Sequence, residues 1–439
     1  MKTFNLWPLY LCICLGIFSL KTHAQELLTL EQAVEITLEN NYDIRLAKNE
    51  LRVDSLGVSP GLAGMLPRVF AQANTNNSIQ NITQTRSDGN VIELDNARNN
   101  SFNYGVGLDW TIFDGLSMFA RYDRLKELEN LGKAELQSTL LNQVSAVMST
   151  YYDLVQQQQQ LTALDSTLVI SRQRVELADN RFSIGKASKL EVLNAKVDLN
   201  TDKTHYVNQS ELYVNTKIRL NEIMARDPKI EFKVVDDVLI ADNLKLDDLE
   251  QLSMTQNPEL QRQLINKRIS ELELKQIKGN RFPKISAITG YNFNNSESSL
   301  GFTTKNNAQG WNYGFAASID IFNGSNQNRN EKIAKVQIEN TTLAIAQQKQ
   351  TIISQLNSAF QTYLTNLNLI DLETHNEEIA KENLDITLAK YKIGTIPTIE
   401  FRAAQLNYIR ATLRLSHAKY EAKLSEITLK QLTGNLSFQ

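Results

Sequence analysis

The residue types that usually carry catalysis or bind metals are scarce in this sequence. After residue 25 the histidines are His205, His375 and His417, which lie far apart on segments with helical patterning. The two cysteines, Cys12 and Cys14, are close to the N-terminus. No HExxH, GxSxG, phosphate-binding or dinucleotide-binding glycine motif occurs, and the methionines are scattered. We therefore expect no enzymatic activity, no cofactor and no metal site.

The N-terminal segment 1–24 has the composition of a secretory signal peptide. Lys2 precedes an apolar run from Leu6 to Leu20, and the small residue Ala24 stands before the expected cleavage point. The run is too short for a membrane-spanning helix. Cleavage would remove both cysteines, so the mature chain would have no disulfide and no thiolate ligand. It would carry 44 basic and 49 acidic residues, without the basic excess of a nucleic-acid-binding protein.

The chemistry that the residue pattern does indicate is contact with lipid. From Phe102 to Ile112, a bulky apolar side chain alternates with Asn, Gly, Asp or Thr. A period of two places the two sets on opposite faces of a β-strand, one suited to lipid and one to water. The stretch also has the roughly 9–11 residues that a tilted strand needs to cross a bilayer. Because no later segment approaches the ~18–20 apolar residues of a transmembrane helix, membrane insertion would require a barrel.

The strand pattern recurs from Trp311 to Ile321, at an offset of 209. The sequences that follow the two strands are Ile-Phe-Asp-Gly at 112–115 and Ile-Phe-Asn-Gly at 321–324. Upstream, Leu-Pro-Arg-Val at 66–69 matches Phe-Pro-Lys-Ile at 282–285, at an offset of 216. We therefore expect one β-hairpin in each half, with polar loops at about 75–100 and 294–309.

Long helices are expected after each β-hairpin. Residues 116–182 contain no proline and a single glycine, and an unbroken helix of that length would reach on the order of 100 Å. Apolar residues recur at alternating spacings of four and three from Leu140 to Leu154 and from about Ile353 to Ile370, as in a coiled coil. Each long helix ends in a matching turn, at 181–185 and 390–394, whose glycine suits the left-handed position after a helix.

These patterns divide the chain into two repeats. The expected parts are a signal peptide over 1–24, a first repeat over 25–225 (β-hairpin about 67–113, helical hairpin about 116–225), a linker over 226–243, and a second repeat over 244–439 (β-hairpin about 283–322, helical hairpin about 325–434). Four strands cannot close a membrane barrel, and an open sheet would expose unpaired backbone groups to lipid. Copies must therefore pool their strands. Two copies would give a filled barrel of eight strands, and three would give twelve strands and a lumen.

Three segments and their order resemble the TolC-like outer-membrane efflux protein family over essentially all of residues 25–436. They are Leu-Thr-Leu-Glu-Gln-Ala at 28–33, the Phe-Asp-Gly strand exit at 113–115, and Arg-Phe-Ser-Ile-Gly-Lys-Ala-Ser-Lys-Leu-Glu-Val-Leu-Asn-Ala at 181–195. The resemblance implies a mixed α/β membrane protein of a Gram-negative bacterium. It would form a homotrimer in which a twelve-stranded outer-membrane β-barrel continues into an α-helical coiled-coil periplasmic tunnel. It also implies an exit duct served by a periplasmic adaptor and an inner-membrane pump of the RND or ABC class.

The resemblance also assigns roles to particular residues. The adaptor would dock at the turns of the helical hairpins, on Arg181, Ser183, Gly185, Lys390, Lys392 and Gly394. In the family, carboxylates just after the second turn constrict the tunnel in acidic rings. Glu400 holds one of these positions and Glu191 is its first-repeat equivalent, but Ala403 stands where a second carboxylate is expected. Three copies of one carboxylate around an axis would favour cations. The alternative for both glutamates is an exposed helix residue without such a role.

Aromatic residues on the strands are expected to form membrane-interface girdles with a structural role. They are Phe102, Tyr104, Trp110, Phe113, Tyr291, Phe293, Trp311, Tyr313, Phe315 and Phe322. Two other functions remain open at this stage, a trimeric coiled-coil surface adhesin and a periplasmic adaptor protein. An adhesin would gather its strands at one end of the chain, and an adaptor needs a lipoyl-like β-domain that the sequence does not show. The pattern leaves the exported substrate open among drugs, metal ions, siderophores and proteins.

Overall fold

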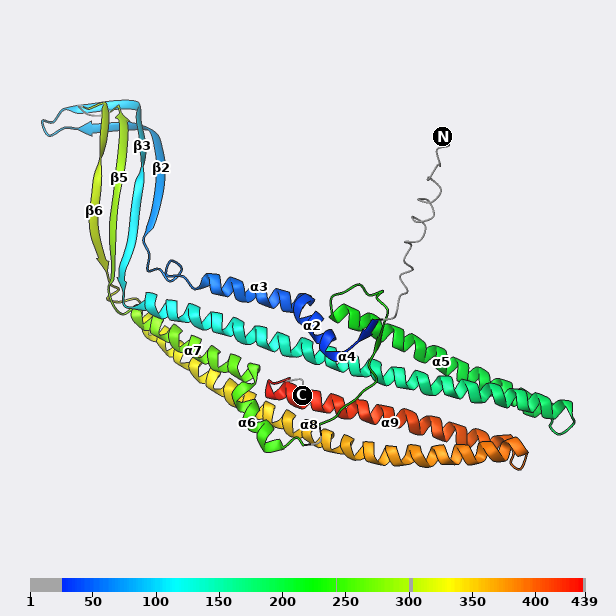
Figure 1. Cartoon of the computed structure of the whole chain (residues 1–439). Helices are drawn as coiled ribbons and strands as arrows, with labels where there is room; N and C mark the ends of the chain where they lie inside the picture. Colours follow the sequence, from blue (N-terminus) through cyan, green and yellow to red (C-terminus); the bar gives the residue numbers. More distant parts are fainter. Residues whose placement is uncertain (1–25, 242, 300–302, 437–439) are drawn as a thin grey trace, which may run out of the picture. The chain divides into compact units, whose positions relative to one another are not determined.

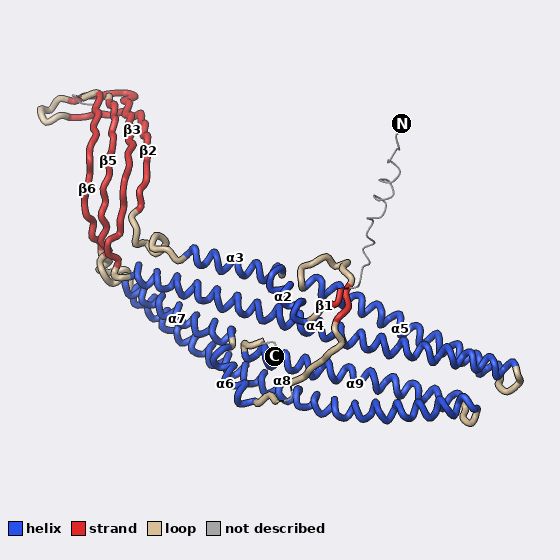
Figure 2. The backbone as a smooth tube through the Cα atoms, in the orientation of Figure 1, coloured by secondary structure: helices blue, strands red, loops and turns tan. Residues whose placement is uncertain are grey.

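The computed structural model describes residues 26–241, 243–299 and 303–436, so the predicted signal peptide over 1–24 lies outside the described residues. The chain forms two compact units. We call the one made of Leu46–Thr139 and Gln256–Ile353 the sheet unit, and the one made of Met1–Arg45, Leu140–Thr255 and Ser354–Gln439 the hairpin unit. Figures 1 and 2 show the course of the chain and the distribution of its helices and strands.

The sheet unit contains one antiparallel sheet with the strand order β2-β3-β5-β6 (Figure 1). Its strands are β2 (Arg68–Thr85), β3 (Val91–Asp114), β5 (Lys284–Ser298) and β6 (Lys305–Ser318). The two central strands, β3 and β5, come from different halves of the sequence. The other two strands, β2 and β6, therefore form the two edges of the sheet within one chain.

The strand register confirms the predicted separation into two faces. Directly opposite residues of an antiparallel pair project to the same face. One row across the sheet consists of Ala71, Val106, Tyr291 and Trp311, and the adjacent row on the other face consists of Gln72, Gly105, Asn292 and Gly310. The first face, which we call the aromatic face, contains a stacked pair of Tyr104 and Phe293 rings with centroids 4.7 Å apart. The other face carries small and amide side chains.

Two sequence predictions about this sheet were wrong. Residues 75–85 and 91–100 belong to strands and not to a loop, so the first hairpin turns only at 86–90. Residues 294–298 and 305–309 likewise belong to β5 and β6. Polar side chains predominate in these segments, and the apolar Ile82, Ile92 and Leu94 form only a short patch near the turn. Backbone hydrogen bonds between neighbouring strands therefore hold them with little apolar burial.

The second difference concerns the end of β6. The alternation predicts a strand through Ile321, but β6 ends at Ser318. The equivalent stretch of β3 continues to Asp114 because Phe113 and Asp114 lie opposite Ile285 and Lys284 of β5. Residues 319–323 have no such partner within the chain, and Ile321 is 96% exposed. A strand needs a neighbour to hydrogen-bond, and the edge position removes it.

Most of the hairpin unit consists of two long antiparallel helix pairs. The first pair is α4 (Ser117–Ser183) with α5 (Lys189–Ile223), and the second is α8 (Asn326–Ile393) with α9 (Thr398–Thr433). The shorter helices of the chain are α2 (Leu30–Asn40), α3 (Tyr42–Gly57), α6 (Leu246–Gln256) and α7 (Pro258–Gly279). Helices α4 and α8 begin in the sheet unit and end in the hairpin unit. Among the described residues, no helix combines the length and the apolarity needed to cross a bilayer.

The predicted heptad seams form the core of the hairpin unit. Val147, Tyr151 and Leu154 of α4 are almost completely buried, as are Leu356 and Tyr363 of α8. Full burial of one such side chain stabilises the fold by about 1.5–3 kcal/mol. In the second repeat the seam runs through Ile352, which is fully buried, and not through the predicted Ile353, which is 42% exposed.

The linker between the repeats is fastened to both returning helices. Its strand β4 (Phe232–Val234) pairs in parallel with β1 (Glu26–Leu28). Lys217 of α5 donates a hydrogen bond to Glu231 at 2.9 Å, and the amide of Ala241 donates one to Glu426 of α9 at 3.1 Å. Lys217 and Glu426 are both buried and are separated by the repeat offset of 209. Equivalent positions of α5 and α9 therefore hold the two ends of the linker, with a lysine in the first repeat and a glutamate in the second.

Candidate functional site at the helical hairpin tips

The two long helices of the hairpin unit end in turns with the same geometry. Gly185 and Gly394 adopt φ angles of +75° and +81°, which confirms the predicted left-handed positions. The amide of Lys186 donates to the carbonyl of Arg181, and that of Thr395 donates to Lys390, at 2.8 and 3.1 Å. A side chain added at either glycine would meet no heavy atom within 4 Å. Both turns therefore present open backbone at the end of the unit.

The predicted tip residues differ in how freely they are presented. Ser183, Lys390 and Lys392 are exposed. Arg181 is half-buried, because its guanidinium lies 3.6 Å from the Glu191 carboxylate and 5.7 Å from the centroid of the Tyr391 ring. Arg181 therefore connects the first turn to the second hairpin, whereas the other charged tip residues face solvent.

A groove of about 770 Å³ lies between the two turns. Its walls come from the start of α5 and from the α8–α9 turn, and they include Glu191, Asn194, Gly394, Pro397, Thr398 and Arg402. Both polar and apolar side chains line it. Both hairpins thus present side chains to one open space next to the turns.

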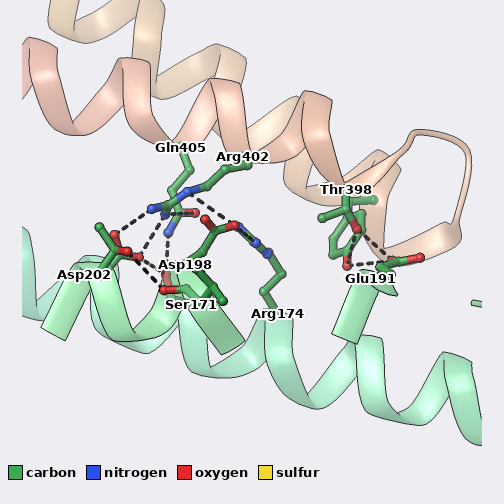
Figure 3. Close-up of polar contacts among 11 residues, drawn as sticks. Ser171, Arg174, Glu191, Asp198, Asp202, Thr398, Arg402 and Gln405 are labelled. Atoms are coloured by element: carbon green, nitrogen blue, oxygen red, sulfur yellow. Dashed lines mark hydrogen bonds and ion pairs between the residues drawn. The ribbon is translucent and has the colours of Figure 1, made fainter. Parts of the chain in front are cut away.

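The structure places the two predicted entrance carboxylates in different surroundings. Glu191 accepts hydrogen bonds from the Thr398 hydroxyl at 2.7 Å and the Tyr391 hydroxyl at 3.4 Å (Figure 3). Its side chain is only 19% exposed. Glu400 lies in the first turn of α9 and is exposed, as is Ala403. Only Glu400 is thus presented to solvent as an entrance carboxylate would be.

A second set of polar residues joins the two hairpins behind the turns. We call Ser171, Arg174, Asp198, Asp202, Arg402 and Gln405 the interhairpin network (Figure 3). The Arg402 guanidinium donates two hydrogen bonds to the Asp202 carboxylate, at 2.8 and 2.9 Å. Arg174 pairs with Asp198. Bidentate pairing of this kind combines charge attraction with fixed geometry.

Because the network is buried, losing one of its members destabilises the protein more than losing a surface ion pair would. The side chain of Arg402 is 11% exposed and that of Asp202 is 5% exposed. Ser171 donates to Asp202 at 2.6 Å and accepts from Gln405 at 3.0 Å, so its hydroxyl is satisfied on both sides. Removing one member of such a buried pair leaves the other without its partner, at about 3–5 kcal/mol. The network therefore holds α9 against both helices of the first hairpin.

The interhairpin network was not predicted from the sequence, although the sequence carries a signal for it. Asp202 stands three residues after Leu199 and four before Tyr206, on the apolar seam of α5. Gln405 stands four residues after Phe401 on the seam of α9. Polar residues at seam positions indicate buried polar contacts, but their partners lie in the other half of the chain and the pattern cannot pair them.

The predicted girdle aromatics lie in the sheet unit and not at the tips. By register, nine of them project from the aromatic face, and Phe322 follows the end of β6. The indole of Trp110 donates to the Met65 carbonyl at 2.9 Å, so its polar group is satisfied. No cluster of three or more metal-ligating side chains occurs within the part of the chain that the structure describes.

Comparison with known proteins identifies the family. The outer membrane efflux protein model matches residues 33–226 and 249–435. TolC of Vibrio cholerae is 20% identical over 99% of this chain and 96% of its own length. The CmeC channel of Campylobacter jejuni (TM-score 0.78, 18% identity) and the open state of the Neisseria gonorrhoeae MtrE channel (TM-score 0.72, 15% identity) share the fold. Each of these structures covers 92% of this chain, and the chain covers 85% and 89% of theirs. The chain therefore belongs to the outer membrane efflux protein family, whose members are trimeric outer-membrane channels of tripartite efflux systems and not enzymes.

Proposed function

We propose that this efflux channel is the exit duct of a tripartite system and docks a periplasmic adaptor on its two hairpin tips. The observation that carries the proposal is the pair of exposed glycine turns flanking an open groove. Both turns have the same backbone geometry, so one adaptor could bind each of them in the same manner. The exposed Lys390 and Lys392 add positive charge at the second turn. An inner-membrane pump of the RND or ABC class would supply the energy.

Exposed apolar stripes on the long helices support assembly with further copies. Leu190 and Val197 of α5 are both exposed and lie seven residues apart. On α8, Leu372, Ile379, Ile386 and Ile393 follow one another at intervals of seven, and all four are exposed. Regular apolar stripes of this kind pack against a partner helix. A homotrimer, as found in the family, supplies that partner without another protein.

Adaptor docking is tested by blocking the tips. Gly185→Trp and Gly394→Trp place bulk on the open turns, and we expect each to reduce recovery of the adaptor in a pull-down from outer-membrane extracts. The matched control is Lys381→Trp, at an exposed position of α8 away from the turn. Normal adaptor recovery with both glycine variants, in trimers that assemble normally, would argue against docking at the turns.

The entrance role of Glu400 is tested by conductance. Three exposed carboxylates around one axis attract cations, so Glu400→Gln is expected to weaken block by a trivalent cation in single-channel recordings. Glu382→Gln changes another exposed carboxylate on α8 and serves as the control. Identical block in Glu400→Gln and the unmodified channel would remove Glu400 from the entrance.

The two other functions considered from the sequence are not retained. The family match extends over both repeats, and its relatives are channels and not adhesins or adaptors. The strands also agree with a channel, because the halves of one sheet come from distant parts of the chain.

A further inference from the structure

Within the part of one chain that the structure describes, the two edge strands of the sheet, β2 and β6, have no strand paired on their outer sides. Unpaired backbone groups in hydrocarbon cost several kcal/mol each, so a membrane sheet must close on itself. In a trimeric barrel, β6 of one copy meets β2 of the next. The fold by itself does not say which residues lie opposite each other at that seam, but the internal repeat does.

The repeat offsets read from the sequence hold in the observed strand pairing. Arg68 of β2 lies opposite Asp109 of β3. The repeat equivalent of Arg68 is Lys284, at the offset of 216, and that of Asp109 is Ser318, at the offset of 209. Lys284 and Ser318 also lie opposite each other. Both hairpins therefore have the same register, and each strand pair of one repeat predicts the equivalent pair of the other.

The pair β3–β5 within the chain is the counterpart of β6 with β2 of the next copy. Leu108 lies opposite Thr289 in the first pair. The repeat equivalent of Leu108 is Ala317, at the offset of 209, and that of Thr289 is Ala73, at the offset of 216. We propose that β6 pairs with β2 of the neighbouring copy in the register that places Ala317 opposite Ala73. The same register sets Tyr313 opposite Asn77, Phe315 opposite Thr75, Trp311 opposite Ile79, and Ile319 opposite Ala71.

This register joins the two aromatic faces without a break. A shift by one residue would set the aromatic side of β6 beside the amide side of β2. It also accounts for Ile79, an apolar residue that follows the polar Thr75 and Asn77 on the same face of β2 and is 64% exposed. Trp311 is 72% exposed. Placed opposite each other, the two form an aromatic and β-branched pair, a combination that stabilises sheets.

The segment after β6 gives a second, independent reason. Residues 319–323 are the counterpart of the last part of β3, which is a strand because β5 pairs with it. The β3–β5 register shifts by one position between Thr111 and Phe113. With the same shift in the proposed pairing, Phe322, 81% exposed, meets Val69 of the neighbouring copy, which is 65% exposed in the single chain. The neighbouring β2 would therefore complete the strand that the alternation of β6 predicts.

The proposed register gives the seam between copies the same stagger as the pairs within one copy. Arg68 of β2 lies opposite Asp109 of β3, which in turn lies opposite Ile288 of β5. Ile288 is four residues beyond Lys284, the repeat equivalent of Arg68. Ile288 lies opposite Gly314 of β6, and the proposed register sets Gly314 opposite Asn76 of the next copy. Asn76 is four residues beyond Gln72, the repeat equivalent of Ile288, so the advance is again four residues. Strand tilt and stagger are linked in a closed barrel, so an equal advance per hairpin keeps the tilt uniform.

Cysteine pairs test the register directly, because the expected mature chain contains no cysteine. We expect Ala73→Cys with Ala317→Cys to form covalent trimers after oxidation of outer-membrane trimers, seen on non-reducing gels. The controls Ala71→Cys with Ala317→Cys and Thr75→Cys with Ala317→Cys shift the pair by two residues on the same face. Directly opposite Cβ atoms lie about 4.5–5.5 Å apart, nearer to the roughly 3.5–4.5 Å of a disulfide than diagonal neighbours. The first pair should therefore cross-link several-fold more than either control.

The inference rests on the trimeric assembly of the family and not on the proposed adaptor docking, so failure of one leaves the other standing. Stronger cross-linking in a control pair would show a different register. Absence of cross-links from all three pairs in trimers that migrate normally on native gels would show that these edges do not pair. If the first variant does not assemble, Thr75→Cys with Phe315→Cys takes its place, since the same register sets these residues opposite each other.

Discussion

Gly115 and Gly324 occupy the same turn in the two repeats, and their φ angles, +70° and +68°, are nearly equal. A Cβ on Gly115 would stand 2.1 Å from the carbonyl oxygen of Gly279, at the end of α7. On Gly324 the nearest neighbour would be the Asn326 amide, 3.9 Å away. Equivalent sequences thus have the same backbone but different surroundings, because Gly115 follows the central strand β3 and packs against α7, whereas Gly324 follows the edge strand β6.

The largest effect is expected from this contrast. Gly115→Ala forces a Cβ into the backbone of Gly279, and the strand-to-helix turn must shift to admit it. We expect little or no folded trimer in the outer membrane. Gly324→Ala carries only the conformational penalty of a left-handed residue, about 1–2 kcal/mol, and should assemble. Heat-modifiable trimers on gels measure both. Equal loss in the two variants would mean that a neighbouring copy packs against Gly324 as tightly as α7 does against Gly115.

The same contrast explains which parts of the fold could be predicted from the sequence. Alternation with aromatic residues identifies a strand with one lipid face, and it located β3 and β6. The matching proline segments at 66–69 and 282–285 indicated where β2 and β5 begin. The alternation failed at residues 75–85 and 91–100, where polar side chains predominate and backbone pairing holds the strands together. It also failed after Ser318, where the side-chain pattern of a strand is present and its partner is not.

At the hairpin tips, too, some features could be predicted from the sequence and others could not. The glycine of each turn could be predicted because a left-handed residue has a local cause, visible in a few neighbouring residues. The interhairpin network could not, since Asp202 and Arg402 are brought together by the packing of two hairpins and not by their spacing. Glu191 and Glu400 were equivalent in sequence, but only the structure shows that one of them is engaged by Thr398 and Tyr391.

The interhairpin network predicts the next largest effect. None of its ion pairs is repeated at the offset of 209, so it joins the repeats through residues that differ between them. Arg402→Ala leaves Asp202 buried without its partner, and we expect a loss of about 3–5 kcal/mol in the free energy of unfolding. Arg414→Ala, also on α9, breaks a pair with Glu373 in which the arginine is 52% exposed and the glutamate 14%, and should cost about 1 kcal/mol.

Thermal unfolding of detergent-solubilised protein separates the two arginine variants. Loosened hairpins should also raise the single-channel conductance of Arg402→Ala, because the network lies just behind the tips. A similar midpoint for both variants would show that the network contributes no more than a surface pair.

A smaller and pH-dependent effect is expected at the linker. Burial raises the pKa of Glu426, but hydrogen bonds from Lys430 and Lys423 outweigh this effect and bring it below the ordinary value of 4.5. The stabilisation from the ionised carboxylate is therefore complete above about pH 4.5 and is lost as the pH falls through the lower folded-state value. Glu426→Gln should cost about 1.5–3 kcal/mol at pH 7, and the difference from the unmodified protein should shrink on acidification. Unfolding midpoints between pH 7 and about pH 3 measure this, because the loss begins below about pH 4.5, and a difference independent of pH over that range would contradict it.

The smallest effect distinguishes the two equivalent glutamates at the tips. Glu191→Gln keeps the shape of the side chain but replaces the charged carboxylate that accepts hydrogen bonds from Thr398 and Tyr391 by a neutral amide. A loss of about 1 kcal/mol in the free energy of unfolding is therefore expected. Glu400→Gln changes an exposed residue and should alter stability by less than about 0.5 kcal/mol. Cation block should respond in the opposite order, strongly to Glu400→Gln and weakly to Glu191→Gln, because only Glu400 faces solvent. If Glu191→Gln instead relieved block without changing stability, the carboxylate would have to leave Thr398 in the assembled channel, and the two repeats would present equivalent entrance residues after all.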